Sequence, residues 1–119
     1  MAGLITTHVL DVARGRPAAN VAVELWRVEP DGNGRTLLRS ARTNADGRTD
    51  APLLAGADLK IGCYELVFGI GEYFGSESVA SGPPFLGQIP VRFGVADPGA
   101  HYHVPLLVSR FAYSTYRGS

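Results

Sequence analysis

The sequence predicts an all-β sandwich, and three of its features support this fold class. Fifteen glycines and eight prolines divide the 119 residues at short intervals. The runs between them are rich in Val, Ile, Leu, Thr, Tyr and Phe, most of them residue types that favour strands. Hydrophobic residues make up 45% of the chain, enough for one core at this length. We therefore expect a single domain over residues 1–119, built from many short strands as in a β-sandwich or barrel.

The first half of the chain alternates apolar runs with turn residues. Residues 4–12 form the first expected strand, and the Pro-Ala-Ala-Asn segment at 17–20 breaks the pattern. Residues 21–28 alternate without a cleanly polar face, which indicates a strand with much of both faces covered. The Glu-Pro-Asp-Gly-Asn-Gly segment at 29–34 is a dense turn signal, so we expect residues 37–43 to return as the hairpin partner.

The second half continues the same pattern with one expected helix. The segment 44–47 ends in Gly47, which suits a left-handed turn position, and residues 48–54 form the next short strand. Residues 63–70 are a further strand, whereas 71–80 lack alternation and are expected to contain a short helix. Three more segments complete about eight expected strands: 89–95, 101–109 and 111–116.

Charge and composition exclude several classes of partner. Lys and Arg together number 11, as do Asp and Glu, so the formal net charge is zero and nothing resembles a footprint for nucleic acid or anionic lipid. A chain without net charge has little colloidal repulsion, so self-association is unsurprising. The lone Cys63 lies in an apolar run and is expected to be a small buried residue. No signal peptide or membrane-spanning run is seen, so a cytoplasmic location is expected.

The three histidines are the first candidates for chemistry. His8 lies in the first expected strand, on the face of Thr6 and Leu10. His101 and His103 are two apart in a strand and therefore point to the same face. Two imidazoles side by side in an apolar run are costly to bury unless something uses them.

The histidines allow three interpretations. Three histidines are a known catalytic zinc set, and a His-x-His strand can supply two of the ligands. The same side chains also suit metal-free acid–base chemistry, because an unperturbed histidine pKa lies near ~6.5. Otherwise they are surface residues at a rim or a subunit contact. Composition and spacing do not rank the first two interpretations.

Two further features carry candidate functional groups. Arg48 is either a solvated charge at the start of a strand or a guanidinium that holds a flat, amide-rich ring and stabilises negative charge. The segment 113–119 is either a frayed tail or the lining of a pocket, because it carries tyrosines, hydroxyls and an arginine. The sequence contains no Gly-x-Ser-x-Gly motif and no phosphate-binding glycine loop.

Three separated motifs resemble the transthyretin-like family. They are TTHVLD at 6–11 followed by GRPA at 15–18, TNADGR at 43–48, and HYHVPLLVS at 101–109 with YSTYRGS at 113–119. The last motif is similar to the hydrolase branch of the family, because the hormone-carrier branch lacks the histidines and the Tyr-Arg-Gly-Ser ending. The resemblance covers essentially the whole chain.

The resemblance implies a fold and an assembly. It implies a transthyretin-like (prealbumin-like) sandwich of two four-stranded antiparallel sheets with one short helix. It also implies a homotetramer, a dimer of dimers, whose active sites line a central channel where the dimers meet. The family uses no metal or cofactor, so the resemblance, and not the histidine spacing, argues against zinc.

The resemblance also implies an activity and a set of site residues. The activity is hydrolysis of the small molecule 5-hydroxyisourate to 2-oxo-4-hydroxy-4-carboxy-5-ureidoimidazoline in urate breakdown. By motif position the catalytic residues would be His8, Arg48, His103 and Ser119, and the substrate-binding residues Tyr116, Arg117 and His101.

Each expected catalytic residue has a role in this hypothesis. His103 would be the base that activates a water, and His8 would hold the water and help to protonate the leaving nitrogen, although these two roles can be exchanged. Arg48 would stabilise the oxyanion, and the hydroxyl or carboxylate of Ser119 would orient a histidine or the substrate. The rival hypotheses are a carrier that binds flat aromatic ligands in the channel without turnover, a zinc-dependent amidohydrolase and a plain interaction module.

Overall fold

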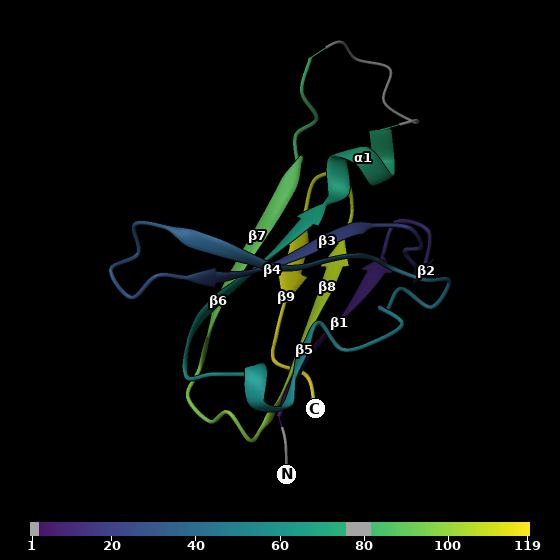
Figure 1. The fold of residues 1–119 in the computed structure, drawn as a ribbon. Helices are drawn as coiled ribbons and strands as arrows, with labels where there is room; N and C mark the ends of the chain where they lie inside the picture. The colour runs from purple at the N-terminus through teal and green to yellow at the C-terminus, as the bar shows by residue number, and fades with distance from the viewer. Residues whose placement is uncertain (1–2, 76–81) are drawn as a thin grey trace.

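The computed structural model describes residues 3–75 and 82–119, which form two packed β-sheets with a short helix at one end (Figure 1). The first sheet has the order β2 (Arg16–Pro17), β1 (Leu4–Asp11), β8 (His101–Val108), β9 (Tyr113–Thr115), and β5 (Leu54–Ala55) also pairs with β1. The second sheet has the order β4 (Arg35–Arg42), β3 (Ala22–Val28), β6 (Gly62–Gly69), β7 (Gln88–Val95). The all-β sandwich predicted from the sequence is confirmed.

Strand direction differs between the two sheets. Every pairing in the second sheet is antiparallel. In the first sheet β1 and β8 run parallel, with Leu4 opposite His101 and Asp11 opposite Val108, which departs from the antiparallel expectation. These two strands lie far apart in the sequence, so no tight hairpin dictates their relative direction.

The short elements depart most from the sequence prediction. The expected strand at 48–54 is wrong: Arg48 makes an isolated bridge with His8, and regular pairing resumes only in β5. Asn44 holds this segment as a loop, because its side chain accepts from the backbone N–H of Asp46 and donates to Asp50.

Two other short elements differ in position from the sequence prediction. Helix α1 (Ile70–Phe74) begins one residue before the predicted range 71–80, whose positions 76–80 lie outside the described residues. β2 forms where the Pro-Ala-Ala-Asn break was expected to begin. Cys63 is half-buried at the start of β6 and carries a free thiol, so it is less enclosed than predicted.

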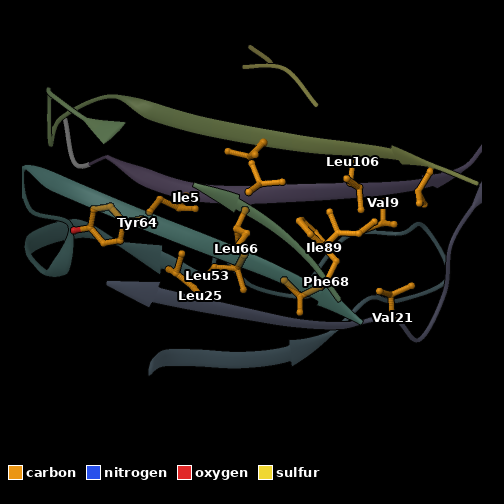
Figure 2. Packing of buried hydrophobic residues seen from close by; sticks show 14 of the residues in the cluster. Ile5, Val9, Val21, Leu25, Leu53, Tyr64, Leu66, Phe68, Ile89 and Leu106 are labelled. Atoms are coloured by element: carbon orange, nitrogen blue, oxygen red, sulfur yellow. The ribbon is translucent and has the colours of Figure 1, made fainter. Parts of the chain in front are cut away.

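The hydrophobic core lies between the two sheets (Figure 2). Along β1 the side chains alternate, so Ile5 and Val9 are fully buried while Thr6 and His8 face outward. Large fully buried side chains from both sheets fill the interior: Ile5, Leu25, Tyr64, Leu66, Phe68, Ile89 and Leu106. This alternation leaves Thr6 and His8 of β1 and His101 and His103 of β8 on the outer face of the first sheet.

Three short segments share one edge of β1. β2 pairs with Leu10 and Asp11, Arg48 bridges to His8, and β5 pairs with Leu4 and Ile5. On the other side of β1 lies β8, whose far edge pairs with β9 and then with Gly118. Segments from the beginning and the end of the chain therefore lie side by side in the first sheet, and both contribute to its outer face. In the described part of the chain no helix is long and apolar enough to cross a membrane.

Candidate active site

A pocket of about 300 Å³ opens on the outer face of the first sheet. Its lining comes from β1, β8, the loop after β4 and the end of the chain: Thr6, Thr7, Arg48, Thr49, Asp50, Ala51, Pro52, His101, His103 and Ser119. Four residues expected from the sequence therefore meet in one cavity: Arg48, His101, His103 and Ser119.

The two histidines of β8 share one hydroxyl group. The parallel register places Thr6 opposite His103, and strand alternation turns Thr6 and both imidazoles outward. Thr6 Oγ1 lies 2.7 Å from His101 Nε2 and 2.8 Å from His103 Nδ1. The two ring centroids are 6.0 Å apart. The threonine hydroxyl thus bridges two imidazoles that do not bond to each other directly.

The surroundings of His103 favour its neutral form. Partial burial lowers the pKa of His103, and its electrostatic interactions with Arg48, His101 and His8 lower it further. A histidine with a lowered pKa is unprotonated at neutral pH and can accept a proton. Its Nδ1 faces Thr6, so Nε2 is the nitrogen that can reach a molecule in the pocket.

Arg48 is positioned by the turn that precedes it. Asn44 Oδ1 accepts from the backbone N–H of Asp46 and of Arg48, and Gly47 takes a left-handed φ of 77°, as its position in the turn predicts. A Cβ at Gly47 would collide with the carbonyl oxygen of Val9, so the close approach of the turn to β1 requires glycine. This approach brings Arg48 into its bridge with His8.

His8 faces outward beside the pocket but is not part of its lining. Its Nε2 lies 2.8 Å from the carbonyl oxygen of Asp46, a contact in which the ring nitrogen must donate. The structure therefore places His8 near enough to affect the pKa of His103, with one nitrogen already committed to the turn.

The end of the chain is held against His103. The backbone N–H of Gly118 donates to the carbonyl oxygen of His103 at 2.8 Å, and Ser119 then enters the pocket. A Cβ on Gly118 would lie 2.6 Å from His103 Cδ2, so this contact leaves no room for a side chain.

Tyr116 and Arg117 are not brought into the same pocket. Both line a second cavity of about 270 Å³ between β7 and the β8–β9 end of the first sheet. The Arg117 guanidinium lies over the ring of Tyr102, 4.3 Å from its centroid, and donates to the carbonyl oxygen of His101 at 3.2 Å. Arg117 therefore fastens the tail to β8.

Sequence reasoning missed several residues of this site. Thr6, Thr49 and Asp50 line the pocket, and Gly118 sets the position of the tail. The strand period does place Thr6 on the face of His8, but its contact with the histidines depends on the β1–β8 register. Within the described ranges, no group of three or more His, Cys, Asp or Glu residues has the geometry to hold a metal ion.

Fold and pocket together define a class of protein, a β-sandwich that carries a histidine-based acid–base site on one sheet face. The model of the HIUase/Transthyretin family matches residues 5–118. A protein named 5-hydroxyisourate hydrolase 2 from Rhizobium meliloti is 54% identical over 118 residues, covering 98% of this chain and 97% of the relative.

Solved structures show the same fold. An (S)-allantoin synthase structure is 46% identical with a TM-score of 0.89, and the match covers 99% of this chain and 44% of that chain. Transthyretin from Sparus aurata is 27% identical with a TM-score of 0.82, covering 96% of this chain and 95% of the other. The chain belongs to the HIUase/Transthyretin family.

Proposed function

We infer that the protein is a hydrolase that opens the ring of 5-hydroxyisourate in urate breakdown. The observation that carries this inference is the joining of His101, His103, Arg48 and Ser119 in one pocket of suitable size. Curated relatives with about half of their residues identical over nearly the whole chain carry the name of this hydrolase. The expected product is 2-oxo-4-hydroxy-4-carboxy-5-ureidoimidazoline.

The chemistry requires a base, a proton for the leaving nitrogen and donors for an oxyanion. The neutral His103 accepts a proton at Nε2 as a water oxygen attacks the acyl carbon of the ring. The Arg48 guanidinium stabilises the negative charge that develops on the carbonyl oxygen. The acyl carbon–nitrogen bond then breaks, and the leaving nitrogen receives a proton.

The remaining site residues take supporting roles in this proposal. His8 presents its Nδ1 to the substrate side of the site, because its Nε2 donates to the carbonyl oxygen of Asp46. Ser119 orients the substrate from the pocket wall. Arg117 fixes the tail and Tyr116 lines the second cavity, and direct contact of either with substrate stays a prediction.

We also propose that residues 1–119 act as one hydrolase domain within a homotetramer, a dimer of dimers. The core cluster draws on strands from Ile5 to Val108, which supports one folded unit. The open edges of β7 and β9 border the same cavity and offer a surface for pairing with a second copy. The cytoplasmic location expected from the sequence stays a prediction.

The test follows the ultraviolet decay of 5-hydroxyisourate, freshly made by oxidation of urate, with and without the protein. We expect decay well above the spontaneous rate, its loss in His103→Asn and in a chain lacking residues 117–119, and no effect of a chelator. Circular dichroism of both variants checks that the fold survives. A folded wild-type protein that binds the substrate without accelerating its decay would overturn the hydrolase and favour the carrier.

A further inference from the structure

A single hydroxyl group joins the two imidazoles of the pocket. Thr6 Oγ1 lies within hydrogen-bond distance of His101 Nε2 and of His103 Nδ1. A hydroxyl has one hydrogen, so Thr6 donates to one ring and must accept from the other. The tautomers of His101 and His103 are therefore not independent of each other.

We propose that Thr6 is a positioning residue that couples the two histidines, passing the proton taken up by His103 on to His101. The inference rests on the proposed hydrolysis for its role in turnover, whereas the coupling itself rests on the contacts of Thr6 alone.

The proton positions balance at every stage. At rest His103 Nδ1–H donates to Thr6, and the Thr6 hydroxyl donates to His101 Nε2, which leaves His103 Nε2 free to act as a base. When Nε2 takes a proton from water, the Nδ1 proton moves to the Thr6 oxygen and the Thr6 hydrogen moves to His101. His103 is then neutral with its hydrogen on Nε2, and His101 carries the positive charge.

The second half of the cycle reverses these transfers. His103 Nε2–H donates its proton to the leaving nitrogen, and the extra proton of His101 returns through Thr6 to His103 Nδ1. One imidazole thus serves first as base and then as acid, while the second stores the proton between the two steps.

The environment of each ring suits its proposed role, with His103 as the base and acid and His101 as the group that stores the proton. His103 is half-buried, and its surroundings disfavour the cation, whereas His101 is exposed to water, which stabilises a charge. The charged and titratable groups that border the two rings come from four segments: His8 of β1, Arg48 and Asp50 of the loop after β4, the partner imidazole on β8, and Arg117 of the tail. Asp50 lines the same pocket, and its carboxylate accepts from the Asn44 side chain at 3.0 Å.

The kinetic test compares Thr6→Val, which removes the hydroxyl at nearly constant shape, with Thr6→Ser, which keeps it. Thr36→Val is the matched control, because Thr36 is exposed on β4 of the second sheet and is not part of the pocket lining. We expect Thr6→Val to lower kcat about 100-fold with little change in KM, a loss typical of general acid–base groups. Thr6→Ser and Thr36→Val should stay near the wild-type rate.

A double-mutant cycle tests whether the three side chains act as one unit. His101→Gln should lower kcat about as much as Thr6→Val, and the double variant should be no slower than either single variant. Additive losses would overturn the relay.

The structural test uses no substrate. Nitrogen-15 shifts of the histidine side chains should place the hydrogens of His101 and His103 on Nδ1 in the wild type, and Thr6→Val should change that distribution. Unchanged shifts in Thr6→Val, or an unchanged kcat, would overturn the proposal. A coupled but inactive wild-type protein would instead overturn only the proposed hydrolysis.

Discussion

Gly118 lies against the ring of His103, where a Cβ would come 2.6 Å from Cδ2. We expect Gly118→Ala to push either the ring or the tail aside, and a misplacement of about 1 Å in a site can cost about 100-fold in rate. The measurement is kcat/KM for 5-hydroxyisourate beside the thermal unfolding midpoint.

Gly75→Ala is the matched control, because a Cβ at Gly75 meets no atom of the described residues within 4 Å. Its rate should stay at the wild-type value. If Gly118→Ala were fully active, the packing of the tail on His103 would have no part in turnover.

Arg48 influences His103 through its charge. A positive neighbour disfavours the imidazolium, so it lowers the pKa of His103, and its removal must raise that pKa toward the ordinary value of 6.5. We expect Arg48→Gln to show this upward shift in a nuclear magnetic resonance titration of His103. Arg39→Gln, on the exposed strand β4, should leave the titration unchanged. A lower pKa in Arg48→Gln would contradict the assigned electrostatics.

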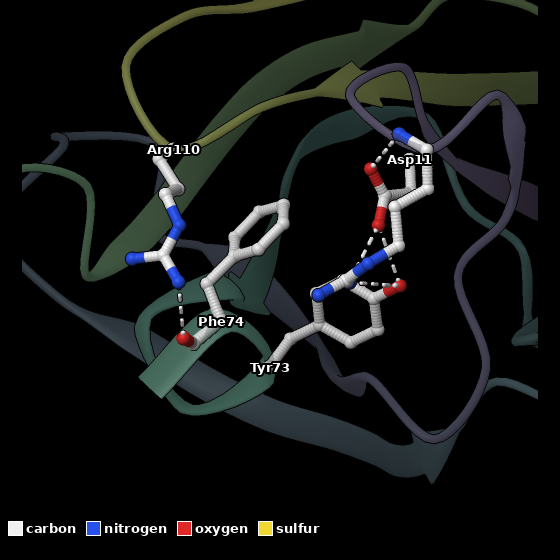
Figure 3. Close-up of polar contacts among 5 residues, drawn as sticks. Asp11, Tyr73, Phe74 and Arg110 are labelled. Atoms are coloured by element: carbon white, nitrogen blue, oxygen red, sulfur yellow. Dashed lines mark hydrogen bonds and ion pairs between the residues drawn. The ribbon is translucent and has the colours of Figure 1, made fainter. Parts of the chain in front are cut away.

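Among the elements, helix α1 is held against the end of β1 and the segment after β8 by a cluster of charged and aromatic side chains (Figure 3). The Tyr73 hydroxyl donates to the buried carboxylate of Asp11 at 2.8 Å, and Arg14 donates to the same group. Arg110 donates to the carbonyl oxygen of Phe74, and its guanidinium lies over the Phe74 ring. The cluster therefore joins the end of β1, the helix and the segment after β8.

The cluster makes stability depend on pH. Burial by itself would raise the pKa of Asp11, but the hydrogen bonds from Tyr73 and Arg14 outweigh it and place the pKa below 3.8. A carboxylate with a lowered folded-state pKa stabilises the fold above pH 3.8, and this stability is lost as the pH falls through the lowered value.

Tyr73→Phe removes one donor from Asp11. We expect it to lower the free energy of unfolding by about 1.5 to 3 kcal/mol at neutral pH, the usual contribution of a hydrogen bond to a charged group. Acid unfolding should begin at a higher pH, since the pKa of Asp11 rises. Urea titrations across the acid range measure both effects, and Thr36→Val on the exposed strand β4 is the control. An acid midpoint identical to the wild type would contradict this account.

The sequence could predict which segments form strands, but it could not predict which strands pair with each other. The periodicity of residues 4–12 and 101–109 correctly placed Thr6 with His8 on one face and His101 with His103 on one face, and the structure turns both of these faces outward. The pairing of β1 with β8 follows from the closure of the whole sandwich, and so does the Thr6 bridge. Arg117 likewise turns to the second cavity because the Tyr102 ring lies there, a contact that local sequence does not encode.

For the molecule as a whole, the open edges predict how copies assemble. β7 and β9 border one cavity on the same side of the sandwich, and β4 forms the opposite edge of its sheet. We expect Tyr113→Lys on β9 to shift sedimentation velocity profiles from the proposed tetramer toward smaller species, because an edge lysine disfavours strand pairing. Leu38→Lys on β4 should leave the assembly intact. The reverse result would place the interface at β4.

The hydrogen bond between Thr6 and His103 spans 97 positions of the chain, and the tail that supports His103 comes later still. During synthesis on the ribosome the first strand emerges long before its parallel neighbour exists. A nascent chain thus carries Thr6 and His8 on a strand with an unpaired edge, and the candidate pocket is incomplete, until residues 101–119 have left the exit tunnel. Contacts between such distant segments also slow folding. Premature termination anywhere before β8 should therefore yield a product that exposes the edge of β1 and is prone to aggregate.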